Sequence, residues 1–116
     1  SVDLNSADAR SLGVETGDMV KIVSASNSSG VIGKARVIEG IRPGVVAVSH
    51  HYGHWELVSR PYLIDGKATD FDPTRGAGIQ VNPVMRLDKI LGNVTLQDKI
   101  GASASFYDTR VKIEKV

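Results

Sequence analysis

Three histidines, His50, His51 and His54, gather in one short segment that also contains Gly53. Neutral imidazoles are ligands that zinc prefers, and three of them can form an open catalytic site. His50 and His54 would share a face only on a helix, and Gly53 disfavours a helix here. The same side chains can instead donate hydrogen bonds to a phosphate or a heterocycle, which requires no metal. The segment therefore predicts a ligand-facing loop, with a histidine-metal enzyme as a weaker hypothesis.

A glycine-rich segment, residues 76–82, ends in Asn82. Its glycines allow the backbone to approach another group closely. The amide of Asn82 can donate to and accept from the edge of a heterocycle at the same time. Asn82 could equally cap the turn that follows through Pro83, because Asn is a preferred capping residue. The glycines do not follow the strand–GxGxxG–helix pattern, so a Rossmann site is disfavoured.

The carboxylates form no catalytic pattern. Asp98 precedes a glycine in residues 96–101, which is typical of a turn residue. Asp65, Asp70 and Asp72 are spread through a polar loop and are expected to be solvated. No Ser/His/Asp arrangement or pair of carboxylates has the spacing that nucleophilic or acid–base catalysis needs. The sequence thus predicts no catalytic residue in this chain.

Alternating apolar residues predict the strands that position these segments. Residues 19–26 predict a strand with Val20 and Ile22 on one face, and residues 31–38 predict the strand that returns beside it. The stretch between them is expected to be the hairpin loop, with Gly30 at positive φ. The remaining predicted elements are a helix over residues 7–12 capped by Asn5 or Ser6, a strand buried on both faces at residues 45–48, a patternless segment at 49–78, a short turn or helix at 82–91, and a last strand at 109–116.

Composition limits the function classes. A chain of 116 residues fits a single domain over its whole length. The net charge of +1 and the absence of a long basic run argue against nucleic-acid binding. No cysteine is present, which removes disulfides and thiolate metal ligands. No apolar stretch is long enough for direct membrane insertion, and no signal peptide is recognisable. Because the chain opens without methionine, we expect a piece of a longer polypeptide.

Taken together, several segments resemble the molybdopterin dinucleotide-binding domain at the C-terminal end of the DMSO reductase family of molybdenum and tungsten oxidoreductases. The matching segments are residues 4–9 with 12–14, then 17–20 and 41–46, then Asn82 with its glycine-rich approach, Asp98, and residues 105–111. The segment containing His50 and the ending Phe106-Tyr107-Asp108 look most like the tetrathionate, polysulfide, thiosulfate and arsenate reductase branch.

The resemblance implies a cofactor-binding role for this chain. It implies molybdopterin guanine dinucleotide as the cofactor, with its molybdenum or tungsten held by residues outside this chain. Asn82 would bond a guanine or pterin edge, and residues 50–54 would line the pterin side. The full set of implied cofactor-binding residues is His50, His51, Gly53, His54, Asn82, Asp98, Ser105, Phe106 and Tyr107.

The resemblance also implies a mainly β fold with short helices, a double-psi β-barrel. The family domain begins with a strand and a cofactor segment before the position of Leu4, and neither is recognisable here. We therefore expect a barrel that lacks its first strand and keeps one edge unpaired, mobile or prone to self-association. Lys99 is a second departure, since many relatives have proline after the aspartate.

The partner implied by the resemblance is the rest of a large catalytic subunit. That parent would reduce a sulfur or arsenic oxyanion in an exported, membrane-associated complex with an iron–sulfur subunit. The alternative is a free-standing double-psi barrel, which would be a binding module or a small subunit of a molybdo-enzyme complex.

Overall fold

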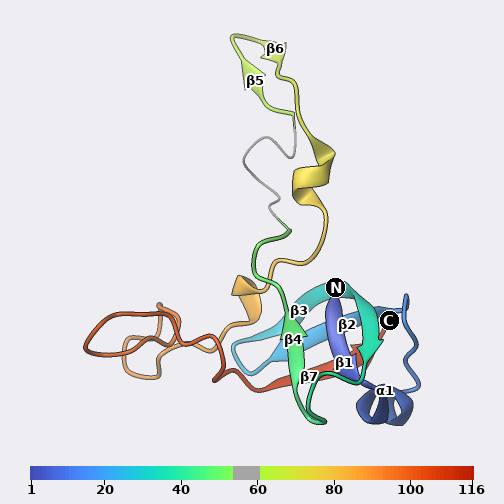
Figure 1. Cartoon of the computed structure of the whole chain (residues 1–116). Coiled ribbons are helices and arrows are strands. Elements are labelled where there is room, and N and C mark those ends of the chain that lie inside the picture. The colour runs from blue at the N-terminus through green and yellow to red at the C-terminus, as the bar shows by residue number, and fades with distance from the viewer. Residues whose placement is uncertain (54–60) are drawn as a thin grey trace.

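The computed structural model describes residues 1–53 and 61–116. A five-stranded sheet with the order β4-β1-β3-β2-β7 forms its centre, and one helix, α1, packs beside it (Figure 1). These elements are β1 (Val2–Asn5), α1 (Ser6–Leu12), β2 (Met19–Ser24), β3 (Asn27–Ile38), β4 (Val46–Val48) and β7 (Val111–Lys115). The described residues are mainly β with one short α-helix, as the sequence predicts.

The chain begins with a strand that the sequence analysis did not expect. β1 runs parallel to β3, with Val2 opposite Ala35, and antiparallel to β4 on its other side. Val2 and Leu4 are completely or almost completely buried, so the strand is a central part of the core. Placing no strand before the helix was therefore wrong. Four residues are too few for a period-2 pattern to stand out, and two of these four are polar.

Helix α1 begins and ends as predicted. The Asn5 side chain accepts a hydrogen bond from the backbone N–H of Ala7 at 2.8 Å, which makes it the N-cap. At the other end Gly13 adopts a left-handed conformation with φ of 63°, a position that favours glycine. The Asn5 side chain also donates to the carbonyl oxygen of Ile41 at 2.8 Å. One buried residue thus joins β1, α1 and the segment before β4.

The hairpin between β2 and β3 turns earlier than predicted. Its turn lies at Ala25 and Ser26, and β3 already begins at Asn27. Gly30 does have positive φ, but it lies within β3, where the register with β2 shifts between Ile22 and Ser24. A Cβ on Gly30 would lie 2.5 Å from the carbonyl oxygen of Ile22. The glycine therefore serves a β-bulge and not the hairpin loop.

Strand β4 is an edge strand in the described sheet. It pairs with β1 alone, and Val46 and Val48 are half-buried while Val45 is exposed. The prediction that residues 45–48 are buried on both faces is therefore wrong. A continuous apolar run does not distinguish a central strand from an edge strand. With β7 at the opposite edge the sheet is open, so a closed barrel stays a prediction.

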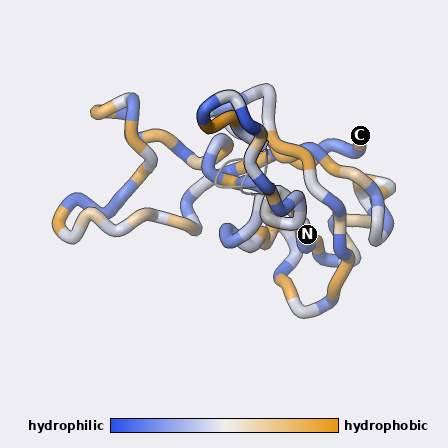
Figure 2. Tube along the Cα trace, turned by 90° about the horizontal axis from the view of Figure 1, so that it is seen from above, coloured by the Kyte–Doolittle hydropathy of each residue, from blue (hydrophilic) through white to orange (hydrophobic). Residues whose placement is uncertain are grey.

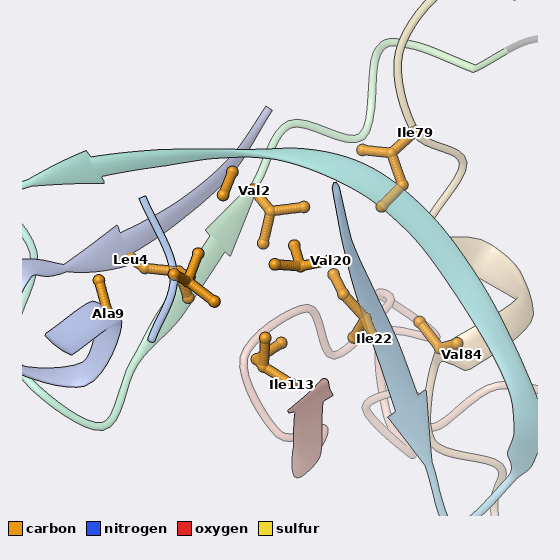
Figure 3. Packing of buried hydrophobic residues seen from close by; sticks show 10 residues of the cluster. Val2, Leu4, Ala9, Val20, Ile22, Ile79, Val84 and Ile113 are labelled. Carbon is orange, nitrogen blue, oxygen red and sulfur yellow. The ribbon is translucent and has the colours of Figure 1, made fainter. Parts of the chain in front are cut away.

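The core lies between the curved sheet and the segments that cross it. Figure 3 shows side chains from β1, β2, β7 and the loop at Ile79 pointing toward one another. The buried set is Val2, Leu4, Ala9, Val14, Val20, Ile22, Ala35, Ile79, Val84 and Ile113. Gly33 leaves the space that Ile79 fills, since a Cβ on Gly33 would lie 2.8 Å from Ile79 Cδ1. The shared buried face predicted for Val20 and Ile22 of β2 is thus confirmed.

Two excursions leave the sheet between β4 and β7 (Figure 1). The first carries a small hairpin, β5 (Leu63–Ile64) and β6 (Lys67–Ala68), and the 3₁₀ helix η1 (Pro73–Gly76). The second follows the 3₁₀ helix η2 (Asn82–Val84) and forms a loop-rich lobe over residues 85–108. Because of these excursions the radius of gyration is 16.5 Å, against about 13 Å for a compact domain of this length.

The sequence predictions for the excursions were partly wrong. Residues 49–78 were expected to have no pattern, yet they contain β5, β6 and η1. In residues 82–91 a turn or helix was expected, and only Asn82–Val84 is helical. After Val84 an isolated bridge joins Leu87 to Thr95, which turns the chain into the lobe.

Candidate functional site

The first excursion and the lobe meet through two rings. His50 and Phe106 are stacked, with ring centroids 5.1 Å apart and planes 19° apart. His51 also lies against His50, with centroids 4.2 Å apart and planes tilted by 36°. The structure therefore brings together three residues that were predicted to bind the cofactor, His50 and His51 from one segment and Phe106 from a distant one. Stacked rings of this kind give a flat, amphipathic surface on which another heterocycle can lie.

Backbone passes close to backbone at Gly53. A Cβ on Gly53 would lie 2.4 Å from the backbone nitrogen of Gln80, and its φ of 75° also favours glycine. Its N–H donates to the carbonyl oxygen of Ala77 at 2.9 Å. Gly78 is also approached too closely for a side chain, because a Cβ there would lie 2.6 Å from Tyr52 Cβ. The close approach predicted for residues 76–82 is therefore made to the chain's own residues 52–53.

A shallow cleft borders this crossing. It has a volume of about 220 Å³ and is lined by Gly53, Gly76, Gly78, Ile79, Gln80 and two residues of β3, Val31 and Ile32. Glycine makes up three of these seven positions, so much of the wall is backbone. Backbone N–H and C=O groups without side chains around them can approach a ligand closely.

A larger cleft lies in the lobe. Its volume is about 420 Å³, within the range of small-molecule sites, and it is lined by Leu96, Gln97, Asp98, Lys99, Ser103, Ala104, Ser105 and Asp108. Two predicted residues, Asp98 and Ser105, share this wall. The Ser105 hydroxyl donates to the carboxylate of Asp108, and the Ser105 N–H donates to the Leu96 carbonyl at 3.0 Å. Ser105, which lines this cleft, directly precedes Phe106 in the chain.

Asp98 also has a structural task in the lobe. One carboxylate oxygen accepts a hydrogen bond from the N–H of Gly101. The backbone of Asp98 donates to the Ser103 carbonyl at 2.8 Å and accepts from the Ala102 N–H at 2.9 Å. The turn predicted at Asp98 is confirmed, and that turn places its carboxylate in the wall of the larger cleft.

Asn82 lies apart from both clefts. It is exposed and begins η2, but its side chain makes no capping hydrogen bond, and the N-cap of η2 is Val81. The alternative that Asn82 caps the following turn with its side chain is therefore wrong. No hydrogen bond of its amide to another described residue is present. The group that could pair with a heterocycle edge is thus directed to solvent.

Two further predicted residues are not placed in a cleft. Tyr107 is 98% exposed and lines neither described cleft. His54 lies outside the described residues. In the part of the chain that the structure covers, no three His, Asp or Glu side chains are arranged to hold a metal ion.

Asp88 was missed by sequence reasoning. It is 4% exposed, and one carboxylate oxygen accepts hydrogen bonds from the N–H groups of Ile90 and Leu91 at 2.8 and 3.1 Å. The other oxygen pairs with Lys99 Nζ at 3.2 Å. The N–H groups of Leu91 and Ile90, followed by the Lys99 ammonium, hold the pKa of Asp88 below its ordinary value. The signal in the sequence is an aspartate shortly before Gly92-Asn93, where a turn is expected.

Asp88 and Lys99 join the two turns of the lobe. Asp88 organises the turn at residues 89–93, while Lys99 belongs to the turn of Asp98. Lys99, which stands where many relatives have proline, therefore has a defined partner in Asp88. The pair fixes the Asp98 side of the larger cleft relative to the start of the lobe.

The candidate site is made of several kinds of aromatic and polar groups. It combines stacked rings, a backbone-lined cleft, a polar cleft with carboxylate acceptors and an exposed amide. These groups can hold a flat heterocycle with N–H and C=O edges. Among the described residues, no helix is long and apolar enough to cross a membrane.

Known proteins resemble this chain over nearly its entire length. The family model of the molydopterin dinucleotide binding domain matches residues 1–96. A selenate reductase subunit of Mesobacillus selenatarsenatis is 49% identical over 99% of the chain, which spans 12% of that relative. A tetrathionate reductase subunit of Salmonella typhimurium is 31% identical over 99% of the chain and 11% of its own length. The arsenate respiratory reductase molybdopterin-containing subunit of Chrysiogenes arsenatis is 39% identical over 98% of the chain and 12% of its length.

These relatives confirm the resemblance found in the sequence, including its sulfur and arsenic oxyanion branch. The cofactor class is confirmed as well. The family model describes a domain that binds molybdopterin dinucleotides, and molybdopterin guanine dinucleotide is one of them. The chain spans about one eighth of the length of the relatives it matches. The chain belongs to the molybdopterin dinucleotide-binding domain family of the molybdenum and tungsten oxidoreductases.

Proposed function

We propose that the parent of this domain reduces an oxyanion of selenium, sulfur or arsenic. The observation that carries the proposal is the agreement of three relatives over at least 98% of the chain, whose names are selenate, tetrathionate and arsenate reductases. The metal of the bound cofactor carries the redox chemistry, and this domain supplies binding, orientation and exclusion of water. Selenate is the first substrate to test, because the selenate reductase relative is 49% identical.

The described residues fit a large, two-ended heterocyclic cofactor. The carboxylates of Asp98 and Asp108 in the larger cleft can accept hydrogen bonds from the N–H groups of guanine. The stacked rings of His50 and Phe106 line the pterin side, next to the backbone-lined cleft at Gly53. Ser105 connects the two regions, because it lines the larger cleft and precedes Phe106.

Asn82 is proposed to bond a guanine or pterin edge. Its exposed amide has no described partner and can donate and accept together. In the parent enzyme, Asn82→Ala is expected to lower cofactor retention, measured as molybdenum or tungsten and guanine nucleotide per polypeptide. Asn93→Ala is the matched control, since Asn93 is also exposed and its only described bond is from its backbone N–H to Leu91. Unchanged metal and guanine content in Asn82→Ala would count against the assignment.

The substrate is tested on the purified parent by oxidation of a reduced dye with selenate, tetrathionate or arsenate. Turnover with one of these and none with nitrate or dimethyl sulfoxide is expected. Turnover with the last two alone would overturn the oxyanion proposal while leaving cofactor binding intact. We further propose that the parent works with an iron–sulfur subunit that passes electrons to the cofactor. The selenate and tetrathionate reductase relatives are each named as one subunit of their enzyme, which fits such a complex.

A further inference from the structure

The first excursion ends in a small ordered arm, residues 61–72. Its hairpin turns at Asp65 and Gly66, which have φ of 51° and 75°, as a tight two-residue turn requires. At the open end, the N–H of Thr69 donates to the Tyr62 carbonyl at 2.9 Å, and the Thr69 hydroxyl accepts from the Tyr62 N–H at 3.2 Å. The arm thus has a defined shape of its own.

The arm carries apolar side chains without a described covering. Leu63 is 72% exposed and Ile64 is 54% exposed, and neighbouring residues of a strand point to opposite faces. Tyr62 and Phe71 are about half exposed at the base. In Figure 1 the arm extends far from the sheet, and β5 pairs with β6 alone. A lone two-stranded hairpin is only marginally stable in water. Its apolar faces therefore fit a surface that is not among the described residues.

The charge of the arm disfavours a second copy of this chain as its partner. Asp65, Asp70 and Asp72 outnumber Lys67, so residues 61–72 carry a net charge of about −2. A symmetric pair would bring two negative arms together, because the same patch is used on both copies. The chain spans 12% of its selenate reductase relative, so the greater part of such a polypeptide is tethered to it. Tethering gives a neighbouring surface a high effective concentration.

We propose that the 61–72 arm docks into an apolar groove, rimmed by Lys or Arg, on the remainder of the parent polypeptide. The inference rests on the proposed function in one respect, namely that this domain works within a larger catalytic subunit. Leu63 and Ile64 would fill the groove, and Asp65 and Asp70 would meet its basic rim. The arm would then anchor the domain at a distance from the cofactor surface around His50 and Phe106.

The absence of cysteine in this chain gives a direct test. Leu63→Cys is made in the parent, and maleimide labelling of that site is followed by mass spectrometry, natively and after unfolding in urea. Because Leu63 is largely exposed in the domain, this substitution should not disturb its fold. Ser28→Cys, at an exposed position of β3, shows that the reagent reaches the sheet. In the native parent, freed of other subunits, we expect Leu63→Cys to be labelled at least tenfold more slowly than in the parent unfolded in urea.

If Leu63→Cys is labelled as fast in the native parent as after unfolding in urea, the proposal is overturned. Protection that disappears when a separate subunit is removed, or when an oligomer is diluted to monomer, would also overturn it, in favour of those partners. A photo-crosslinker attached at position 63 should join peptides outside the 116 residues. The proposed function fails separately if the native parent contains no molybdopterin.

Discussion

His50 and Phe106 lie ring against ring at 5.1 Å, although almost half of the chain separates them in sequence. The contact joins the segment after β4 to the end of the lobe. Both residues belong to segments that were predicted to bind the cofactor, so their contact is the point where the two halves of the candidate site meet.

Removal of the ring at position 106 should loosen the segment after β4. Phe106→Leu keeps an apolar side chain but ends the stacking, which is worth about 0.5–1.5 kcal/mol for an aromatic pair. The imidazole resonances of His50 should move in NMR spectra, and the parent should retain less cofactor. Tyr107→Leu is the control, because Tyr107 is almost fully exposed. An unchanged His50 spectrum in Phe106→Leu would mean that the rings do not stack in solution.

Gly53→Ala should be far more destabilising than Gly92→Ala. Both glycines have positive φ, 75° and 70°, so each substitution costs about 1–2 kcal/mol in backbone conformation. Only Gly53 has backbone atoms at 2.4 Å from the added Cβ, whereas nothing lies within 4 Å at Gly92. Overpacking adds about 1–3 kcal/mol. Urea unfolding of both variants measures the difference, and equal midpoints would disprove the close crossing at Gly53.

The lobe should lose stability in acid through Asp88. Its pKa is lowered in the folded state by the N–H groups of Leu91 and Ile90 and by Lys99. A lowered pKa means that the stabilisation is complete above the unfolded value of 3.8 and is lost as the pH falls through the folded value. Asp88→Asn should therefore weaken the stability at neutral pH and flatten its decline below about pH 4.

The acid prediction is measured by urea unfolding at several pH values between neutral and strongly acidic. Asp70→Asn is the matched control, because Asp70 is exposed in the arm. In this control, the free energy of unfolding should change with pH much as it does in the unmodified chain. If Asp88→Asn kept the full acid sensitivity, another carboxylate, such as Asp3 or Asp18 with their ion pairs, would be responsible.

Asn5→Ala should destabilise the chain by about 2 kcal/mol. The change removes an N-cap, worth about 1 kcal/mol, and leaves the Ile41 carbonyl without its donor, at a similar cost. Asn5→Asp keeps the capping oxygen and loses the donor, so its effect should separate the two contributions. Ser6→Ala, one residue further, should be nearly neutral in thermal unfolding. Equal effects at positions 5 and 6 would contradict the capping role of Asn5.

Sequence reasoning predicted the parts of the fold that are governed by local pattern. Val20 and Ile22 lie two residues apart in β2 with Lys21 between them, and their shared buried face follows from the period of a strand. β1 was missed because its burial depends on pairing with β3 and β4, which are distant in sequence. Gly30 was assigned to the hairpin loop because positive φ occurs in turns and bulges alike.

The candidate site was predictable only as separate segments. The residue types in 50–53 and 105–107 indicated ligand contact, but nothing in their spacing places His50 beside Phe106. Asp88 looked like an ordinary loop residue, since its burial depends on the lobe folding back to bring Lys99 within 3.2 Å. The glycines of 76–78 were correctly predicted to allow a close approach, while the approaching segment, Tyr52-Gly53, could not be named in advance.

Figure 2 shows apolar stretches along the lobe as well as along the strands. Among its exposed apolar side chains are Ile90, at 83%, and Ile100, at 98%. We expect such residues to be covered in the parent, since large exposed apolar patches usually mark interaction sites. Their exposure here agrees with a domain that spans a small part of its relatives.

Strand β7 completes the sheet, because it pairs along β2 after both excursions have been made. During synthesis on the ribosome, β2 therefore emerges long before its outer neighbour. Its outer hydrogen-bonding edge stays open until Val111–Lys115 has been translated, and non-local pairing of this kind is slow. Translation order thus makes the arm and the lobe available for contacts before the sheet is finished.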